Sequence, residues 1–218
     1  MPDRIMIVVA GGSSVRFGAD KMMADVGGSP LVGHTVRAVV GHVDQCILVC
    51  REDQMQTLGE LDLGVALVPG GPTRTTSEMS GLAAVETPTT LIGIHDGARP
   101  LVPAKLIDLL YDTAARVGGA VPVSAPSRPL IHKSDLSPAS GLVVAQTPQV
   151  FQGEQLLAAY VKAARIEYEA QDTAEIVQRF SRLSIEAVPG AEENLKVTFP
   201  EDLERVRDLL DVSHNDVR

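Results

Sequence analysis

The chain lacks several features that would point to a nucleic-acid or membrane protein. It has no tryptophan, only 3% aromatic residues and a net charge of -9. Stacking on bases needs aromatic side chains and following a phosphate backbone needs basic ones, so this composition argues against a nucleic-acid partner. No apolar run approaches the ~20 residues of a membrane span, and no basic apolar leader opens the sequence. We therefore expect a cytoplasmic protein that binds no membrane.

Cysteine is also scarce. The only two, Cys46 and Cys50, lie four residues apart, a spacing that places both on one face of a strand. With no histidine beside them, they are expected to pack in the core rather than to bind metal. The 218 residues, 44% of them hydrophobic, can bury one sizeable core. We predict a single domain spanning residues 1–218.

The most informative segment of the sequence is residues 5–21. Its first six residues are apolar and mostly β-branched, which predicts a strand buried on both faces. Gly11 and Gly12 then allow a sharp turn, and the amides of residues 11–14 can point at an anion. Arg16 and Lys21 add two cations on the same loop. The combination predicts a polyphosphate site, and hence a nucleotide; a structural turn with solvated cations is the alternative.

Two well-known nucleotide loops do not fit this stretch. The dinucleotide fingerprint separates its first two glycines by one residue, whereas Gly12 directly follows Gly11. The ATPase phosphate loop needs Gly-Lys-Ser/Thr, and here Lys21 is flanked by Asp20 and Met22. The loop therefore belongs to another class of nucleotide site.

Apolar periodicity along the rest of the chain predicts alternating strands and helices. Strands are expected at 45–50, 65–68, 91–94 and 120–123, and helices at 31–40, 53–58, 77–85 and 103–116. This alternation predicts a mostly parallel sheet in a Rossmann-like, three-layer α/β/α fold. Residues 124–146, rich in proline and serine, interrupt it and are predicted to form a projecting β-arm. Helices at 154–165 and 172–180, a strand at 184–188 and a helix at 200–210 complete the domain, with a loose tail from residue 211.

In such sheets the ligand lies beyond the carboxyl ends of the strands, so the residues there are the candidates for a site. Asp96, next to Gly97, suits a Mg²⁺ ion that is held mainly by phosphates; a loop-capping aspartate is the alternative. His95 is expected to orient the Asp96 loop rather than to do acid-base work. A second nucleotide contact, or only a helix entrance, is predicted at Gly70, Gly71, Arg74 and Ser77.

These candidates fall within an ordered series of motifs. After the opening loop come Gly-Gly-x-x-Arg-x-x-Ser at 70–77, His-Asp-Gly-Ala-Arg-Pro at 95–100, Ala-Gln-Thr-Pro-Gln-Val-Phe at 145–151 and Asn-Leu-Lys-Val-Thr at 194–198. Together they cover nearly the whole chain. In this order they resemble the 2-C-methyl-D-erythritol 4-phosphate cytidylyltransferases of the non-mevalonate isoprenoid pathway.

The resemblance implies transfer of CMP from CTP to a phosphorylated polyol, with release of pyrophosphate, Mg²⁺ as the cofactor and a homodimer formed through the arm. It implies that Arg16, Lys21 and Lys196 stabilise the phosphates and the transition state, and that Asp96 holds the metal. Acceptor binding is implied for Asp96, Arg99 and Thr147. The implied nucleotide-binding residues are Ala10, Gly11, Gly12, Ser13, Ser14, Gly70, Gly71, Arg74 and Ser77.

On the acceptor side the chain departs from the family pattern. Ala125 and Pro126 replace a polar Asp-Thr pair that faces the acceptor, and Ala139 replaces an arginine that reaches the acceptor phosphate across the dimer. Arg128 and Lys133 of the arm, together with His132, either take over phosphate binding or are simply solvated. Transfer to another acceptor, such as ribitol 5-phosphate or the molybdenum cofactor, and CTP binding without catalysis are therefore alternatives.

Overall fold

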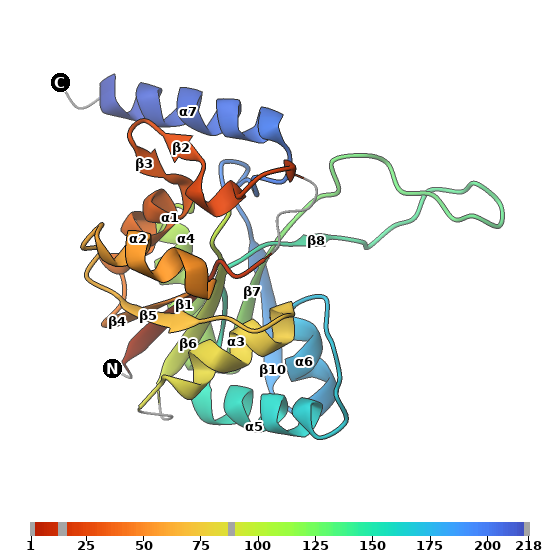
Figure 1. Cartoon of the computed structure of the whole chain (residues 1–218). Coiled ribbons are helices and arrows are strands. Elements are labelled where there is room, and N and C mark those ends of the chain that lie inside the picture. Colours follow the sequence, from red (N-terminus) through yellow and green to blue (C-terminus); the bar gives the residue numbers. More distant parts are fainter. Residues whose placement is uncertain (1–2, 13–16, 87–89, 216–218) are drawn as a thin grey trace.

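The computed structural model describes residues 3–12, 17–86 and 90–215, and its centre is one large twisted sheet (Figure 1). The seven strands of the main path run in the order β10-β7-β9-β6-β1-β4-β5. Along the chain they are β1 (Arg4–Val9), β4 (Gln45–Cys50), β5 (Ala66–Pro69), β6 (Leu91–Asp96), β7 (Gly118–Ser124), β9 (Gln149–Gln152) and β10 (Ser184–Pro189).

The sheet is mostly parallel, as predicted. β1 pairs in parallel with β4 and β6, β4 with β5, and β10 with β7. The exception is β9, which the sequence did not predict and which runs antiparallel between β6 and β7. Because β9 inserts between two strands that point the same way, it joins the two halves of the sheet.

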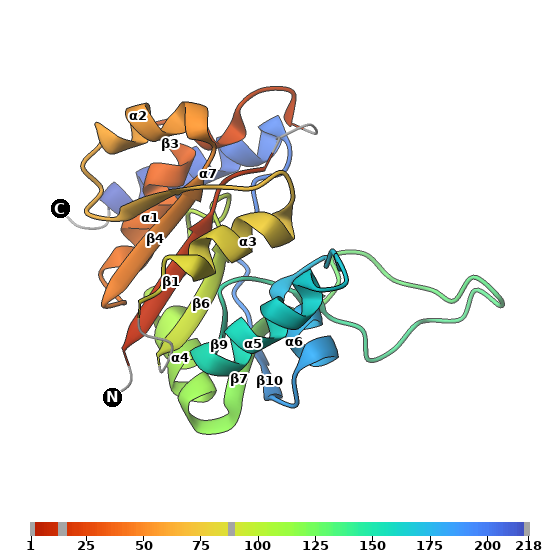
Figure 2. The ribbon, with the colours of Figure 1, turned by 60° about the horizontal axis from the view of Figure 1, so that its bottom comes forward.

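Helices cover both faces of the sheet (Figure 2). Side chains alternate across β1, so that Met6 and Val8 face one hydrophobic cluster and Ile5 and Ile7 face the other. The first cluster is closed by α1 (Leu31–Val40), α2 (Met55–Gly59), α4 (Ala104–Val117) and α7 (Pro200–Asn215). The second is closed by α3 (Arg74–Ala83), α5 (Gly153–Ala164) and α6 (Thr173–Phe180). The predicted three-layer α/β/α fold is confirmed.

Two predicted helix boundaries are wrong. α3 begins at Arg74 rather than at residue 77, because the Thr73 hydroxyl caps it by accepting a hydrogen bond from the Thr76 amide. The final helix α7 continues to Asn215, where a loose tail was expected. A small hairpin, β2 (Asp25–Val26) and β3 (Ser29–Pro30), was not predicted from the sequence. Its two-residue turn has positive φ at both glycines.

The segment predicted as an arm does project from the domain (Figures 1 and 2). Its base is the antiparallel pairing of β7 with β8 (Val144–Ala145), and farther out a single bridge joins Ile131 and Pro138. Large apolar side chains along the arm are exposed: Leu130, Ile131, Leu136, Leu142 and Val143. Such a surface is typical of a segment that packs against something else.

The two cysteines lie in the core, as predicted. Both are free and buried on β4, and burial raises the pKa of Cys46 to about 12, so its thiol is unreactive at neutral pH. None of the helices in the described part of the chain is long and apolar enough to cross a membrane.

Candidate active site

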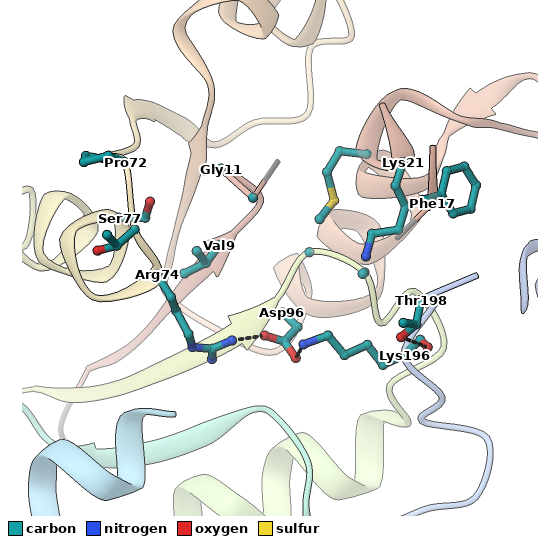
Figure 3. Close-up of a pocket in the computed structure, with 15 residues that line it drawn as sticks. Val9, Gly11, Phe17, Lys21, Pro72, Arg74, Ser77, Asp96, Lys196 and Thr198 are labelled. Carbon is teal, nitrogen blue, oxygen red and sulfur yellow. Dashed lines mark hydrogen bonds and ion pairs between the residues drawn. The ribbon is translucent and has the colours of Figure 1, made fainter. Parts of the chain in front are cut away.

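A pocket of about 370 Å³ opens where β1 and β6 end (Figure 3). Segments 9–12, 17–22, 72–77, 96–98 and 196–198 contribute its lining. Seven of the residues that the sequence predicted for the site are thereby brought together, from five separate segments: Gly11, Gly12, Lys21, Arg74, Ser77, Asp96 and Lys196. The rule that ligands bind at the carboxyl ends of parallel strands applies here.

The glycine turn, Gly11 and Gly12, forms part of the lining of this pocket. The amide of Ala10 donates to the carbonyl of Val49 at 2.7 Å, which ties the end of β1 to β4. A Cβ on Gly11 would lie 3.2 Å from Ser77 Oγ, so the glycine lets the turn approach α3 closely. Three predicted residues of this loop, Ser13, Ser14 and Arg16, lie outside the described residues.

Gly70 and Gly71 line a neighbouring pocket of about 330 Å³, which they share with Gly11. The amide of Gly70 donates to the carbonyl of Cys50 at 2.8 Å, and a Cβ on Gly71 would collide with the side chain of Thr76. Ser77 Oγ donates to the carbonyl of Gly71 at 3.1 Å. This second glycine turn is therefore held against the start of α3, next to the first.

Asp96 is the charge centre of the pocket. Arg74 Nη1 lies 2.7 Å from its Oδ1, and Lys196 Nζ lies 2.8 Å from its Oδ2 (Figure 3). Arg99 Nε lies 3.4 Å from the same Oδ2. Burial alone would raise the pKa of Asp96, but these cations hold it well below its usual value. Burial likewise opposes the charge on Arg74, yet the carboxylates of Asp96 and Glu78 raise its pKa. Asp96 is thus an ionised carboxylate shared by three cations.

Lys21 reaches the pocket from the side opposite Arg74 (Figure 3). Its Nζ donates to the carbonyl of Val197 at 2.9 Å, next to Lys196 in the chain. Two ammonium groups and a guanidinium therefore surround the space above Asp96, an arrangement suited to an anionic ligand with several charges. Phe17 also lines the pocket and was not predicted, although it lies between Arg16 and Gly18 in the motif that identified the loop.

Two residues predicted for acceptor binding, Arg99 and Thr147, do not line the pocket. Arg99 is buried behind Asp96, where its Nη1 donates to the carbonyl of Asn194 at 2.6 Å. Thr147 is buried too; its Oγ1 accepts from the amide of Asp96 at 3.0 Å, and its carbonyl accepts from Asn194 Nδ2 at 2.9 Å. In this structure both residues hold Asp96 and the 194–196 loop in place.

His95 extends this supporting network. It is completely buried, with Nδ1 3.0 Å from Thr147 Oγ1 and Nε2 3.2 Å from the carbonyl of Arg99. Burial lowers the pKa of His95 to about 4, so the ring is neutral near pH 7. These contacts support the interpretation that His95 orients the Asp96 loop.

The two arm residues predicted for the acceptor phosphate, Arg128 and Lys133, are exposed, and neither lines the pocket of the same chain. The arm extends away from the domain in both views (Figures 1 and 2). Only a second subunit, or a movement of the arm, would bring these cations to a strand-end pocket.

The residues present fit a divalent cation held mainly by its ligand. In the part of the chain that the structure describes, no group of three or more His, Cys, Asp or Glu side chains could hold a metal ion. Asp96 is the only carboxylate among the described residues that line the pocket, and its depressed pKa keeps it ionised. A single carboxylate suits Mg²⁺, which usually keeps several waters and binds substrate phosphates.

Comparison with known proteins agrees with these features. Residues 4–211 match the sequence model of the family described as 2-C-methyl-D-erythritol 4-phosphate cytidylyltransferase. The chain is 35% identical to the protein of that name from Porphyromonas gingivalis, over 95% of this chain and 97% of the relative. It is 32% identical to the one from Bacillus velezensis, over 91% of each.

Solved structures show the same likeness. The enzyme of that name from Thermus thermophilus is 28% identical and superposes with a TM-score of 0.80, covering 96% of this chain and 98% of the other. The 4-diphosphocytidyl-2C-methyl-D-erythritol synthase from Anaerococcus prevotii has a TM-score of 0.83 at 24% identity, covering 96% and 99%, and so supports the fold.

Proposed function

Because the chain belongs to the 2-C-methyl-D-erythritol 4-phosphate cytidylyltransferase family, we propose that it transfers CMP from CTP to 2-C-methyl-D-erythritol 4-phosphate and releases pyrophosphate. The observation that carries this proposal is the ring of cations, Lys21, Arg74 and Lys196, around the strand-end pocket above Asp96. Such a pocket suits a nucleoside triphosphate in a reaction that builds up negative charge. We place this reaction in the cytoplasm, where CTP is available.

The chemistry needs no general base. A phosphate monoester has a second pKa of ~6, so the acceptor is largely a dianion near neutral pH. One of its oxygens attacks the α-phosphorus of CTP, a new P–O bond forms, and the bond to the bridging oxygen of the β-phosphate breaks. Pyrophosphate leaves with the electron pair of that bond. No proton has to move, which agrees with the burial of His95 outside the pocket lining.

What the reaction does need is alignment of two anions that repel each other. Lys21 and Lys196 approach the pocket from segment 17–22 and from the 194–198 loop, and we assign them to the phosphates. Arg16 lies outside the described residues, and we assign it to the phosphates from the sequence motif alone. Preorganised cations of this kind stabilise the transition state because they need not reorganise as charge develops.

Mg²⁺ would be held by Asp96 together with the phosphates of CTP. When bound, it supplies positive charge that offsets the charge developing on the phosphates. Asp96 already serves as the common partner of Arg74, Arg99 and Lys196, so its ionised state does not depend on the metal.

The acceptor is proposed to bind at a dimer interface. Arg99 and Thr147 already contact other groups, and Ala139 offers no charge, so the acceptor phosphate needs another cation. Arg128 and Lys133 lie on the arm, whose exposed apolar residues would be covered by a second copy of the chain. We propose a homodimer in which the arm of one subunit supplies these cations to the other.

Pyrophosphate release tests the proposal. The protein would be incubated with CTP and Mg²⁺ and, in parallel, with methylerythritol phosphate, ribitol 5-phosphate, the molybdenum cofactor or no acceptor. Release that requires methylerythritol phosphate is the expected result. Release with another acceptor alone would overturn the assigned substrate, and CTP binding without release under any condition would overturn catalysis.

A further inference from the structure

A buried carboxylate lies behind the pocket, one helical turn after Arg74. Glu78 of α3 is only 1% exposed, and its Oε1 lies 2.9 Å from Arg74 Nε. The hydroxyl of Tyr160 on α5 donates to Oε2 at 2.5 Å, and Thr173 Oγ1 on α6 donates to Oε1 at 3.2 Å. Three helices of the same layer therefore meet on this one carboxylate.

Burying a carboxylate at this position costs free energy, because the charge loses its hydration. An apolar side chain of similar size would fill the same space without that cost. Each of its three partners offers a positive charge or an O–H donor, so the site is built for an acceptor with two oxygens. Glu78 does not line the pocket. Its one link to the pocket is the guanidinium of Arg74.

Arg74 is held by two carboxylates, of which Figure 3 shows Asp96. Asp96 contacts Nη1 at 2.7 Å at the pocket wall, and Glu78 contacts Nε at 2.9 Å from behind. The side chain of Arg74 keeps 26% exposure, which leaves part of it open to the pocket. With one of these carboxylates removed, the guanidinium loses the second point that fixes its direction.

We propose that Glu78, held by Tyr160 and Thr173, is a positioning residue that fixes the Arg74 guanidinium in the wall of the CTP pocket. This inference rests on the proposed function, because it takes CTP as the ligand that Arg74 meets. The pocket then presents a cation already in place, and CTP binding does not have to order a flexible arginine. A purely structural role, in which Glu78 only joins α3, α5 and α6, is the alternative.

Glu78→Gln tests the role, because the amide keeps the shape and removes the charge. Metal-free CTP affinity, measured by calorimetry, should fall roughly ten-fold, the scale of one lost charged hydrogen-bonding contact. Tyr160→Phe should weaken it less, in the same direction, since Glu78 keeps its contact with Arg74. The matched control is Tyr111→Phe on α4, far from Arg74. It removes a buried hydrogen bond of 2.6 Å that the Tyr111 hydroxyl donates to the carbonyl of Ile5. It should lower the melting temperature but leave CTP affinity unchanged.

A double-mutant cycle with Arg74→Ala separates positioning from structure. In the parent, Glu78→Gln should lower the melting temperature, because a buried ion pair is broken. In Arg74→Ala the same change should lower it much less, because burial raises the pKa of Glu78 and, without Arg74 to oppose this, the carboxyl takes up a proton and no ion pair remains to be broken. CTP affinity in the Arg74→Ala background should change less than two-fold when Glu78→Gln is added.

Two results would overturn the positioning role. One is an equal loss of CTP affinity from Glu78→Gln with and without Arg74; the other is a loss from Tyr111→Phe as large as that from Tyr160→Phe. The calorimetric and thermal readouts use no acceptor. Absence of turnover with methylerythritol phosphate would therefore refute the proposed acceptor alone and leave the test of Glu78 intact.

Discussion

Replacing Asp96 by asparagine removes the charge that three cations share, and the structure predicts effects of opposite sign on stability and on CTP binding. Losing one partner of a buried ion pair costs about 3–5 kcal/mol. Lys196 is 37% exposed on its side chain and can turn to water, so most of the cost comes from Arg99 and Arg74, whose side chains are 9% and 26% exposed. We expect about 3 kcal/mol, which for a chain of this size lowers the melting temperature by about 6–12 °C.

The same change should tighten the binding of metal-free CTP. Repulsion between two unit charges about 4 Å apart is about 1 kcal/mol even at the dielectric constant of water, so its removal is worth roughly five-fold in affinity. Turnover with Mg²⁺ should nevertheless fall by about two to three orders of magnitude, because the protein loses the carboxylate that we propose holds the metal.

Three measurements check this prediction: thermal unfolding, calorimetry with CTP in the presence of a chelator, and pyrophosphate release with Mg²⁺. Asp108→Asn is the matched control, because Asp108 also pairs with an arginine, Arg4, at 2.8 Å but lies outside the pocket. An Asp96→Asn protein as stable as the parent, or one that binds metal-free CTP more weakly, would refute the charge arrangement described here.

Three further predictions test other parts of the molecule. Lys21→Ala should lower turnover by about 10²–10³-fold in steady-state assays, with a much smaller loss of CTP affinity; near-parental turnover would remove Lys21 from the mechanism. Arg128→Ala and Lys133→Ala should raise the KM of the acceptor but not that of CTP, and the protein should sediment as a dimer. Fully active monomers at micromolar concentration would contradict the arm model. Gly81→Ala should destabilise the fold by about 1–3 kcal/mol in urea unfolding, because its Cβ would lie 2.5 Å from Ile7 Cγ2; parental stability would contradict this packing.

The strands and helices that the sequence predicted well are those whose burial pattern is local. The predicted ranges 31–40 and 45–50 agree with α1 and β4, since each has an apolar periodicity that its own residues determine. The strand β9 was not predicted, because Val150 and Phe151 form too short an apolar pair. Its extended form depends on pairing with β6 and β7 on either side. The sequence of β9 itself does not indicate this pairing.

The residues of the candidate site also differ in how well the sequence predicted their positions. Residues on short motifs at strand ends, such as Gly11, Lys21 and Asp96, were predicted because the chain order of a parallel sheet places them at one edge. Arg99 and Thr147 belong to equally clear motifs, yet they turn inward. Their partners are the backbone of Asn194 and of Asp96, and a motif does not state which side of a loop faces its neighbours.

Arg74 shows most clearly why a motif predicts a residue but not its surroundings. Its spacing from Gly71 and Ser77 indicates a helix entrance near a nucleotide, and the structure places all three in or beside the pocket wall. The direction of its guanidinium depends on Glu78, and that carboxylate depends on hydroxyls that lie 82 and 95 residues farther along the chain. Sequence spacing alone cannot relate such distant groups. The second layer of helices, which seemed only to cover the sheet, therefore also determines how one cation meets the ligand.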